Sequence, residues 1–294
     1  MAKINPIKPT PMIAIVGETA SGKSALSLQL AQQFNGEIIA ADAMTVYQKF
    51  DIGTAKPSKN EQALVPHHLI DIVDASEQFS AAQYKQHAQA AIEDVAGREK
   101  LPLLVGGSGL YIDSVLFDYV FRSKSNVAYR QKLEEMNASE LAELARDRGL
   151  DTSDIDIRNK RRMIRFIETN GQTPKRNSLR QNTLIIGMSI DREALKERVE
   201  KRVDTMFQQG LENEVQGLSQ QYGWELDPMR SVGYREWQAY FADLKSINEV
   251  KNTIITHTMQ LAKKQRTWFK RNTSIKWVNN FDEAVEYTTT FLNK

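Results

Sequence analysis

The chain has 294 residues, with 39 Lys and Arg, 37 Asp and Glu, 41% hydrophobic residues and no cysteine. This length is enough for one large domain or two ordinary ones, each with a buried core. The lack of cysteine excludes a disulfide scaffold, a thiolate metal site and a cysteine nucleophile. The four histidines lack zinc-ligand spacing. No apolar run approaches the roughly 18 residues of a membrane span and the N-terminus has no apolar signal core, so we expect a cytoplasmic protein with no membrane association.

The net charge of +2 conceals a difference between two parts of the chain. Residues 1–121 contain 9 basic and 13 acidic residues, whereas residues 122–294 contain 30 and 24. The positive excess in the second part is compatible with a polyanionic partner. On charge alone, ordinary solvated helix faces are the simpler interpretation, so the charge does not identify a function.

The first 120 residues alternate between short apolar runs and amphipathic stretches. The runs Met12–Val16, Glu37–Ala41 and Leu101–Val105 are mainly apolar, which is typical of buried parallel strands. Between them, Ser24–Phe34 and Ala81–Val95 place apolar side chains on one helical face. This order predicts an α/β fold, in which helices cover a parallel sheet.

The pattern then changes to polar, helix-prone sequence over residues 122–182. Within it, the apolar spacing predicts helices over Tyr129–Met136, Ser139–Arg148 and Arg158–Thr169. We interpret the whole stretch as a small helical insertion.

After the insertion the chain is expected to return to the sheet. Thr183–Ile190 is typical of a strand, Asp191–Arg271 of successive helices separated by glycines, and Ile275–Val278 of a last strand. The predicted core domain therefore consists of two stretches, residues 1–121 and 183–294.

The strand at Met12–Val16 runs directly into a glycine-rich loop that begins a helix. Its sequence, Gly17-Glu18-Thr19-Ala20-Ser21-Gly22-Lys23-Ser24, fits the phosphate-binding pattern G-x-x-x-x-G-K-[ST] at every fixed position. The backbone N–H groups and the helix N-terminus in such a loop bind an anion. Lys23 adds charge for the terminal phosphate, and the Ser24 hydroxyl can hold Mg²⁺. The loop therefore predicts a site for a di- or triphosphate, with Mg²⁺ as cofactor.

Two further polar residues follow strands and belong at the same edge of the sheet. Asp42 follows the run Glu37–Ala41, and Ser108 lies in the turn Gly106–Tyr111 after the run Leu101–Val105. Ligands of parallel sheets bind at the carboxyl ends of the strands, so both residues are candidates for catalysis. For Asp42 three roles are open: general base, Mg²⁺ ligand or helix cap. The turn with Ser108 is equally compatible with a structural βα connection.

Several segments together resemble the tRNA dimethylallyltransferase family, also called tRNA isopentenyltransferases. The combination of D-I-G-T-A-K-P with V-G-G-x-G-L-Y is specific, because an ordinary kinase has no need of both. The matching segments are GETASGKS at 17–24, ADAMTVYQKFDIGTAKP at 41–57, residues 68–71 with 79–80, VGGSGLY at 105–111, RRMIRFIE at 161–168, SVGYRE at 231–236 and QLAKKQRTW at 260–268. The chain departs from the family at Glu18, where Pro is usual, at Ser108, where Thr is usual, and at His257, where Arg is common.

The resemblance implies a P-loop NTPase-like sheet and transfer of a dimethylallyl group from dimethylallyl diphosphate to an adenine of tRNA. The acceptor would be N6 of adenine 37, next to the anticodon, in tRNAs that read codons beginning with U. The phosphate loop would hold the diphosphate of the donor, although such loops are often described as ATP sites. Asp42 would accept a proton from N6, and Ser108 would lie close to the reacting groups. Ala43, Met44 and Thr45 would line the path of the adenine.

The resemblance also implies contacts with the anticodon stem-loop of the tRNA. We expect the protein to be a monomer. Residues in two basic segments are expected to make the tRNA contacts: Arg161, Arg162, Met163, Ile164 and Arg165 in the insertion, and Lys263, Lys264 and Arg266 near the end of the chain. Apart from the resemblance, such clusters are usually solvated helix faces. Trp268 is expected to anchor the second segment to the core, and Arg230 is a candidate ligand of the diphosphate.

Two other functions fit parts of this pattern. A P-loop small-molecule kinase would use Asp42 as the base for a hydroxyl acceptor and would transfer phosphate from ATP. It would not need the basic second part of the chain. An RNA-associated P-loop switch protein would need nucleotide-dependent switch loops, and the sequence offers no convincing apolar strand that ends in a Walker-B-type Asp.

Overall fold

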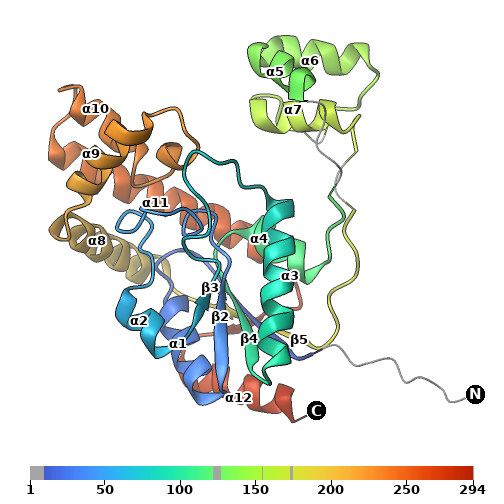
Figure 1. Cartoon of the computed structure of the whole chain (residues 1–294), viewed down its shortest axis with the longest axis vertical. Coiled ribbons are helices and arrows are strands. Elements are labelled where there is room, and N and C mark those ends of the chain that lie inside the picture. Colours follow the sequence, from blue (N-terminus) through green and yellow to red (C-terminus); the bar gives the residue numbers. More distant parts are fainter. Residues whose placement is uncertain (1–9, 122–126, 154, 173–174, 294) are drawn as a thin grey trace, which may run out of the picture. The chain divides into compact units, whose positions relative to one another are not determined.

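The computed structural model describes residues 10–121, 127–153, 155–172 and 175–293 (Figure 1). The expectations for the N-terminus and for the start of the insertion at residues 122–126 lie outside the described residues. The chain forms two compact units, one from Met1–Leu116 with Leu179–Lys294 and the other from Phe117–Ser178. Among the described residues, no helix has both the length and the apolar character needed to cross a membrane.

The described residues of the first unit contain a six-stranded parallel sheet with the order β3-β2-β4-β1-β5-β6. The strands are β1 (Met12–Val16), β2 (Gly36–Ala40), β3 (His67–His68), β4 (Leu101–Gly106), β5 (Thr183–Met188) and β6 (Lys276–Val278). In the centre of the sheet, Ile13 of β1 pairs with Leu103 of β4 and with Leu184 of β5. Every residue of β1 and β2 is buried, which explains their apolar character and confirms the predicted parallel α/β sheet.

Helices cover both faces of this sheet. On one face, α1 (Lys23–Gln33) and α12 (Phe281–Leu292) share a core with the strands. On the other face, α3 (Ala81–Gly97) packs against α4 (Gly109–Leu116) and against β2 and β4. The hydroxyl of Tyr84 on α3 donates to the carbonyl oxygen of Ala40 at 3.0 Å, which fixes this helix near the carboxyl end of β2.

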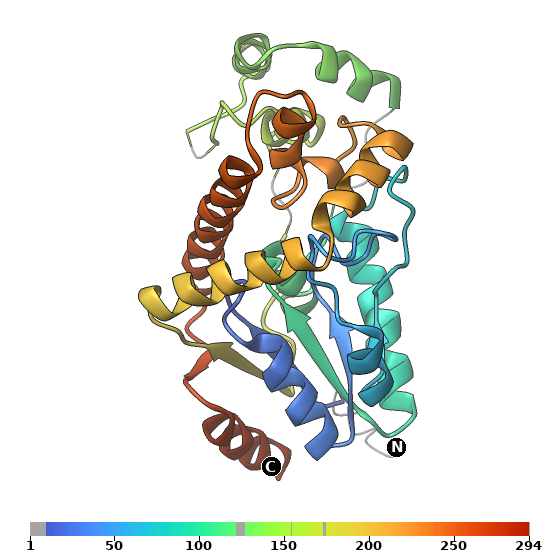
Figure 2. The same cartoon turned by 90° about the vertical axis from the view of Figure 1, so that its left-hand side faces the viewer.

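A group of helices lies beyond the carboxyl ends of the strands (Figure 2). It includes α8 (Arg192–Gln208), α9 (Leu211–Tyr222), η1 (Pro228–Arg230), η2 (Arg235–Trp237), α10 (Gln238–Phe241) and α11 (Ile247–Phe269). These helices share a second core with the segment that follows β2. In this core, Val46 and Phe50 of the segment and Trp237 of η2 are fully buried. The short helix α2 (Lys59–Leu64) follows that segment. The second core therefore holds the loops at the carboxyl edge of the sheet in place.

The second unit is a small helical body with a core of its own. Its helices are α5 (Val127–Glu135), α6 (Ala138–Asp147) and α7 (Lys160–Glu168). Leu133, Leu141, Ala145, Met163, Ile164 and Ile167 form its buried cluster. The three helices lie where the sequence predicted helices, within one or two residues at most ends.

Candidate active site

A cavity of about 330 Å³ opens at the carboxyl edge of the sheet. Its walls come from the phosphate loop, the ends of β2 and β4, the segment after β2, and the helices α8 and α11. Lys23 and Asp42 both line this cavity, as the positions of their strands predicted. The cavity therefore joins an anion-binding loop to a carboxylate.

The phosphate loop has the backbone geometry that its glycines allow. Gly22 adopts a φ of 103°, in the left-handed region that favours glycine, and forms the N-cap of α1. No side chain caps the first N–H groups of α1 in the described structure, so they remain available to an anion. Thr19, Ala20, Gly22, Lys23 and Ser24 line the cavity.

Lys23 lies inside the loop and is prepared for an anionic ligand. Its Nζ donates to the backbone carbonyl oxygen of Glu18 at 2.6 Å. Burial, with the neighbouring Arg202 cation, lowers the pKa of Lys23 to about 8, while Asp42 and Glu18 act in the opposite direction. A bound diphosphate would stabilise the charged ammonium form of this side chain.

Asp42 and Ser108 are joined through the backbone between β2 and β4. The Asp42 Oδ1 atom accepts the N–H of Met44 at 2.8 Å, which forms a tight turn. The Ser108 hydroxyl oxygen accepts the N–H of Ala43 at 2.9 Å, and the Ser108 N–H donates to the carbonyl oxygen of Ala41 at 3.2 Å. Asp42 therefore caps a turn rather than a helix, so the helix-cap alternative is wrong.

A close approach of two strands makes this arrangement possible. A Cβ atom on Gly106 would lie 2.0 Å from the carbonyl oxygen of Ala41, so no larger residue fits there. The glycine in the turn after β4 thus brings Ser108 against the end of β2. The Ser108 hydroxyl accepts the Ala43 N–H and donates to no group among the described residues, so its proton is available to a substrate.

Of the three residues expected along the path of the adenine, Thr45 lines the cavity and the other two do not. Its side chain is 6% exposed, and its hydroxyl has no hydrogen-bond partner among the described residues. A buried hydroxyl without a partner is costly unless a ligand or water pairs with it. Ala43 and Met44 instead supply the two backbone N–H groups that fix Ser108 and Asp42.

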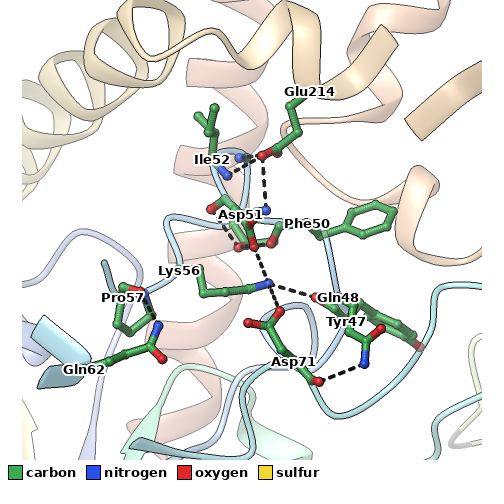
Figure 3. Close-up of polar contacts among 12 residues, drawn as sticks. Tyr47, Gln48, Phe50, Asp51, Ile52, Lys56, Pro57, Gln62, Asp71 and Glu214 are labelled. Carbon is green, nitrogen blue, oxygen red and sulfur yellow. Dashed lines mark hydrogen bonds and ion pairs between the residues drawn. The ribbon is translucent and has the colours of Figure 1, made fainter. Parts of the chain in front are cut away.

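The D-I-G-T segment enters the cavity on a loop held by a carboxylate of α9. The Glu214 carboxylate accepts the backbone N–H groups of Asp51, Ile52 and Gly53 at 3.2, 2.7 and 3.1 Å (Figure 3). It also accepts the hydroxyl of Tyr234 at 2.7 Å. These bonds fix the backbone immediately before Thr54, which lines the cavity.

Lys56, the lysine of the same motif, stabilises this loop through its side-chain bonds. The side chain of Lys56 is 4% exposed, and its Nζ lies 2.6 Å from the Asp51 carboxylate and 2.5 Å from that of Asp71. It also donates to the carbonyl oxygen of Tyr47 at 2.9 Å (Figure 3). The D-I-G-T-A-K-P signature is therefore mainly a scaffold that presents its central backbone to the cavity.

Sequence reasoning missed two arginines of α8 that line the cavity. The Arg202 guanidinium donates to the Thr19 hydroxyl and to the Thr54 carbonyl oxygen, both at 3.2 Å. Arg198 donates to the carbonyl oxygen of Ser21 at 3.0 Å. Burial lowers the pKa of Arg202, and the Asp42 carboxylate opposes this shift. Their spacing of four residues places them on one helix face, which was the available signal.

Gln265 of α11 was also missed, and it bridges two loops of the site. Its Oε1 accepts the Thr19 N–H at 2.7 Å, and its Nε2 donates to the Gly107 carbonyl oxygen at 3.0 Å. One amide group thus connects the phosphate loop to the turn before Ser108.

Arg266 and Arg230 differ from their expected places. The Arg266 guanidinium pairs with the Glu18 carboxylate of the phosphate loop at 2.6 Å, whereas the sequence predicted a contact with tRNA; its side chain is 32% exposed. Arg230 does not line the cavity; it pairs with Glu225 at the protein surface. The structure therefore brings Arg198 and Arg202, and not Arg230, to the place of the diphosphate.

The remaining cations of the late basic segment gather on the outer side of α11. They surround an open hollow of about 530 Å³ whose lining is Gln260, Lys263, Lys264, Thr267, Trp268 and Arg271. The indole N–H of Trp268 donates to Asp113 of α4 at 3.0 Å, which anchors the helix as expected. We name Lys263, Lys264, Trp268 and Arg271 the α11 basic face.

In the insertion, α7 separates the expected residues into two groups. Arg161 and Arg162 are exposed, and Arg165 forms an ion pair with Glu168 at 3.3 Å. Met163 and Ile164 are 0% and 2% exposed and lie in the core of the unit. Their side chains are therefore not available to tRNA as the sequence predicted, because they pack in this core and hold the helix.

The chain is similar to known proteins in both sequence and structure. Residues 45–272 match the family model described as IPP transferase. A tRNA dimethylallyltransferase of Streptococcus equi subsp. zooepidemicus is 42% identical over 272 residues, or 90% of each chain. One from Staphylococcus haemolyticus is 38% identical over 305 residues, covering 96% of this chain and 92% of the relative.

Solved structures agree with these relatives. The full-length tRNA isopentenylpyrophosphate transferase of Bacillus halodurans is 33% identical, with a TM-score of 0.75 and coverage of 97% of this chain and 96% of its own. A eukaryotic dimethylallyltransferase crystallised while acting on tRNA is 26% identical, with a TM-score of 0.80 and coverage of 97% and 80%. On its sequence, its fold and its cavity, the chain belongs to the tRNA dimethylallyltransferase (IPP transferase) family.

Proposed function

We propose that this chain transfers the dimethylallyl group of dimethylallyl diphosphate to N6 of adenine 37 in tRNAs that read codons beginning with U. The observation that supports this most directly is the cavity in which the phosphate loop and Asp42 meet. A prenyl transfer needs one site for a leaving diphosphate and another for the acceptor proton. The cavity contains both sites.

The donor half of the cavity binds negative charge. The N–H groups at the start of α1, with Lys23, Arg198 and Arg202, would surround the diphosphate. As the bond between the prenyl carbon and the diphosphate oxygen breaks, the electron pair goes to the diphosphate. Fixed cations and N–H dipoles that already face this position stabilise the developing charge.

Mg²⁺ is the expected cofactor of this half, and the donor set fits it. The Ser24 hydroxyl and the Asp42 carboxylate line the same cavity. Protein sites for Mg²⁺ commonly use one or two oxygen ligands and complete the shell with substrate phosphates and water. A bound Mg²⁺ would supply additional neutralisation of the leaving diphosphate.

The acceptor half handles one proton. The target adenine must leave the helical stack of the anticodon loop to reach a buried cavity. Asp42 would accept a hydrogen bond from N6–H and then take the proton while the nitrogen forms its new bond to the prenyl carbon. Ser108 would keep the turn of Asp42 in register, and the unpaired Thr45 hydroxyl would contact the purine.

The tRNA would contact two basic groups, one on each compact unit. These are Arg161, Arg162 and Arg165 on α7 of the insertion, and the α11 basic face. We propose that the protein acts as a monomer in the cytoplasm; the residues that line the cavity all belong to the first compact unit, so a single copy of the chain supplies the donor and acceptor groups.

A labelling experiment separates this function from its alternatives. Purified protein is incubated with Mg²⁺ and either radiolabelled dimethylallyl diphosphate or ATP labelled at the γ-phosphate, with and without bulk tRNA. We expect label in tRNA from the prenyl donor only, and prenylated adenosine after digestion. Phosphate transferred from ATP to a small acceptor would establish the kinase alternative. Nucleotide binding with no transfer of either label would favour the switch protein.

A further inference from the structure

The phosphate loop contains a carboxylate where negative charge opposes its function. Glu18 is the second residue of the loop, and its side chain is 5% exposed. Its own backbone carbonyl oxygen accepts the Lys23 Nζ, so it is adjacent to the principal cation of the loop. An uncompensated carboxylate in this position would repel the diphosphate, and in a poorly solvated environment the repulsion is strong.

Arg266 supplies the missing compensation. Its Nε lies 2.9 Å from Glu18 Oε1 and 3.2 Å from Oε2, and its Nη2 lies 2.6 Å from Oε1. The same Nη2 donates to the carbonyl oxygen of Ile190 at 3.2 Å, just after β5. A paired guanidinium with this many fixed bonds is a well-oriented partner for a buried carboxylate.

The neighbouring residue of α11 contacts the next position of the loop. Gln265 bonds the N–H of Thr19, whereas Arg266 bonds the side chain of Glu18. Two consecutive residues of one helix therefore hold two consecutive residues of the phosphate loop. On the same helix, Lys263 and Lys264 belong to the α11 basic face. The cations of α11 therefore lie in two places: Arg266 at the phosphate loop, and these lysines on the outer side.

We propose that Arg266 is a positioning residue of the donor site, which neutralises Glu18 and fixes the phosphate loop for the donor diphosphate, and that it is not a tRNA contact. The proposal rests on the proposed function only for the identity of the donor. Its physical content is that the role of Arg266 exists because Glu18 is present. Removing the carboxylate therefore removes the need for the arginine.

The test is a double-mutant cycle in the full-length protein with inorganic diphosphate as the probe. The dissociation constant of inorganic diphosphate with Mg²⁺ is measured by calorimetry without tRNA, so the result does not depend on prenyl transfer. Arg266→Met should weaken binding at least ~10-fold, because it leaves a buried carboxylate beside the ligand. Glu18→Gln alone should remain within about 3-fold of wild type. The double variant Glu18→Gln with Arg266→Met should recover to within about 3-fold of wild type.

Steady-state kinetics give the second readout. With prenyl donor and tRNA, Arg266→Met should raise the KM for the donor by the same factor, with kcat, the KM for tRNA and its salt dependence unchanged. Lys264→Met, on the outer face of the same helix, should raise the KM for tRNA and weaken its salt dependence, with the KM for the donor unchanged. Arg266→Lys, which retains the charge with fewer bonds, should lie between wild type and Arg266→Met in diphosphate binding and provides a milder variant if Met impairs folding.

Two outcomes would overturn the proposal. If the double variant binds diphosphate as weakly as Arg266→Met, the effect of the arginine does not pass through Glu18. If Arg266→Met leaves diphosphate binding intact and weakens tRNA binding, Arg266 is an RNA contact after all. A wild-type protein that binds diphosphate yet transfers no prenyl group would count against the proposed function and would leave the cycle interpretable.

Discussion

Asp42 is the residue whose surroundings define its role most narrowly. Its Oδ1 is fixed by the Met44 N–H, while Oδ2 has no partner among the described residues and can face a ligand. The carboxylate lies in the same cavity as Lys23 and Arg202. A fixed acceptor oxygen beside an anion site suits a base for a weakly nucleophilic exocyclic amine, whose lone pair is delocalised into the ring.

The substitution Asp42→Asn distinguishes the two roles that remain open to this residue. The asparagine amide would retain an oxygen for the Met44 N–H, so the turn should persist, but it cannot take a proton. We expect kcat to fall by roughly 10²–10⁴-fold, with little change in the KM for donor or tRNA. Single-turnover kinetics at saturating substrates would measure this. Weaker donor binding that depends on the Mg²⁺ concentration, with kcat retained, would instead identify Asp42 as a metal ligand.

Lys23 gives the donor site a pH dependence with a definite sign. Burial and Arg202 lower its pKa to about 8, and only the protonated ammonium attracts diphosphate. The free enzyme should therefore bind the donor best below pH 8, and kcat/KM for the donor should fall as the pH rises through 8, since this ratio reports the free enzyme. A pH profile of kcat/KM checks the effect. Lys23→Arg should remove this alkaline limb, and its persistence in that variant would assign the limb to another group.

At the scale of elements, the sequence predicted the buried strands well and the short elements poorly. β1, β2 and β4 were predicted almost residue by residue, because strands buried on both faces are continuous apolar runs. The two-residue strand β3 and the six-residue helix α2 are too short to show periodicity. α4 was hidden because it begins at Gly109, inside a glycine turn, and depends on packing against α3.

In the site, residues within local motifs were predicted, whereas residues brought in by tertiary packing were not. The phosphate loop and Asp42 could be found from local motifs, since strand ends meet at one edge of a parallel sheet. Arg202 and Gln265 come from helices distant in sequence, and their contacts with Thr19 depend on tertiary packing. Met163 and Ile164 were assigned to tRNA because they lie within a matched segment, whereas their alternation with arginines on α7 already indicated a buried face.

The edge strand β3 is attached to the sheet by a charged cluster that titrates at low pH. Glu37 at the start of β2 bonds Arg98 and His68, and the Arg98 hydrogen bond lowers its pKa to about 2. Because the folded-state pKa lies below the ordinary value of 4.5, the stabilisation is complete above that value and is lost as the pH falls towards 2. Glu37→Gln should lower the melting temperature at pH 7 by at least about 3 °C. It should also flatten the dependence of melting temperature on pH below 4.5, as differential scanning calorimetry would show.

The core of the insertion can be tested separately from the cavity. Met163 is fully buried among side chains of the second unit, so Met163→Ala should cost about 2–5 kcal/mol of local stability. Hydrogen exchange of the α5, α6 and α7 amides should accelerate, while the affinity for inorganic diphosphate stays unchanged because the donor cavity is built from the first unit. Unaltered exchange in these helices would show that Met163 does not support them.

At the scale of the whole molecule, positive charge is distributed over both compact units. The net charge of +2 is too small to attract a polyanion by itself, so RNA affinity must come from local groups. Arg161 and Arg162 are exposed on one unit, and the α11 basic face lies on the other. Two modest sites on one chain increase each other's occupancy through effective concentration.

Charge reversals in each group test this distribution quantitatively. Each Lys or Arg that neutralises an RNA phosphate contributes about one unit to the slope of log affinity against log salt concentration. Reversing Arg161 and Arg162 to Glu should therefore lower the slope by up to about two units, and reversing Lys263 and Lys264 should do the same. Combining all four should lower it by about four units, while binding of inorganic diphosphate remains that of wild type.

Lys196→Glu, an exposed lysine on α8 outside both groups, is the matched control and should leave the slope unchanged. Filter binding to tRNA over a range of salt concentrations gives the slopes. If the Arg161 and Arg162 variant keeps the wild-type slope, the insertion does not neutralise RNA phosphates with this face, and the tRNA contacts lie on the α11 basic face instead.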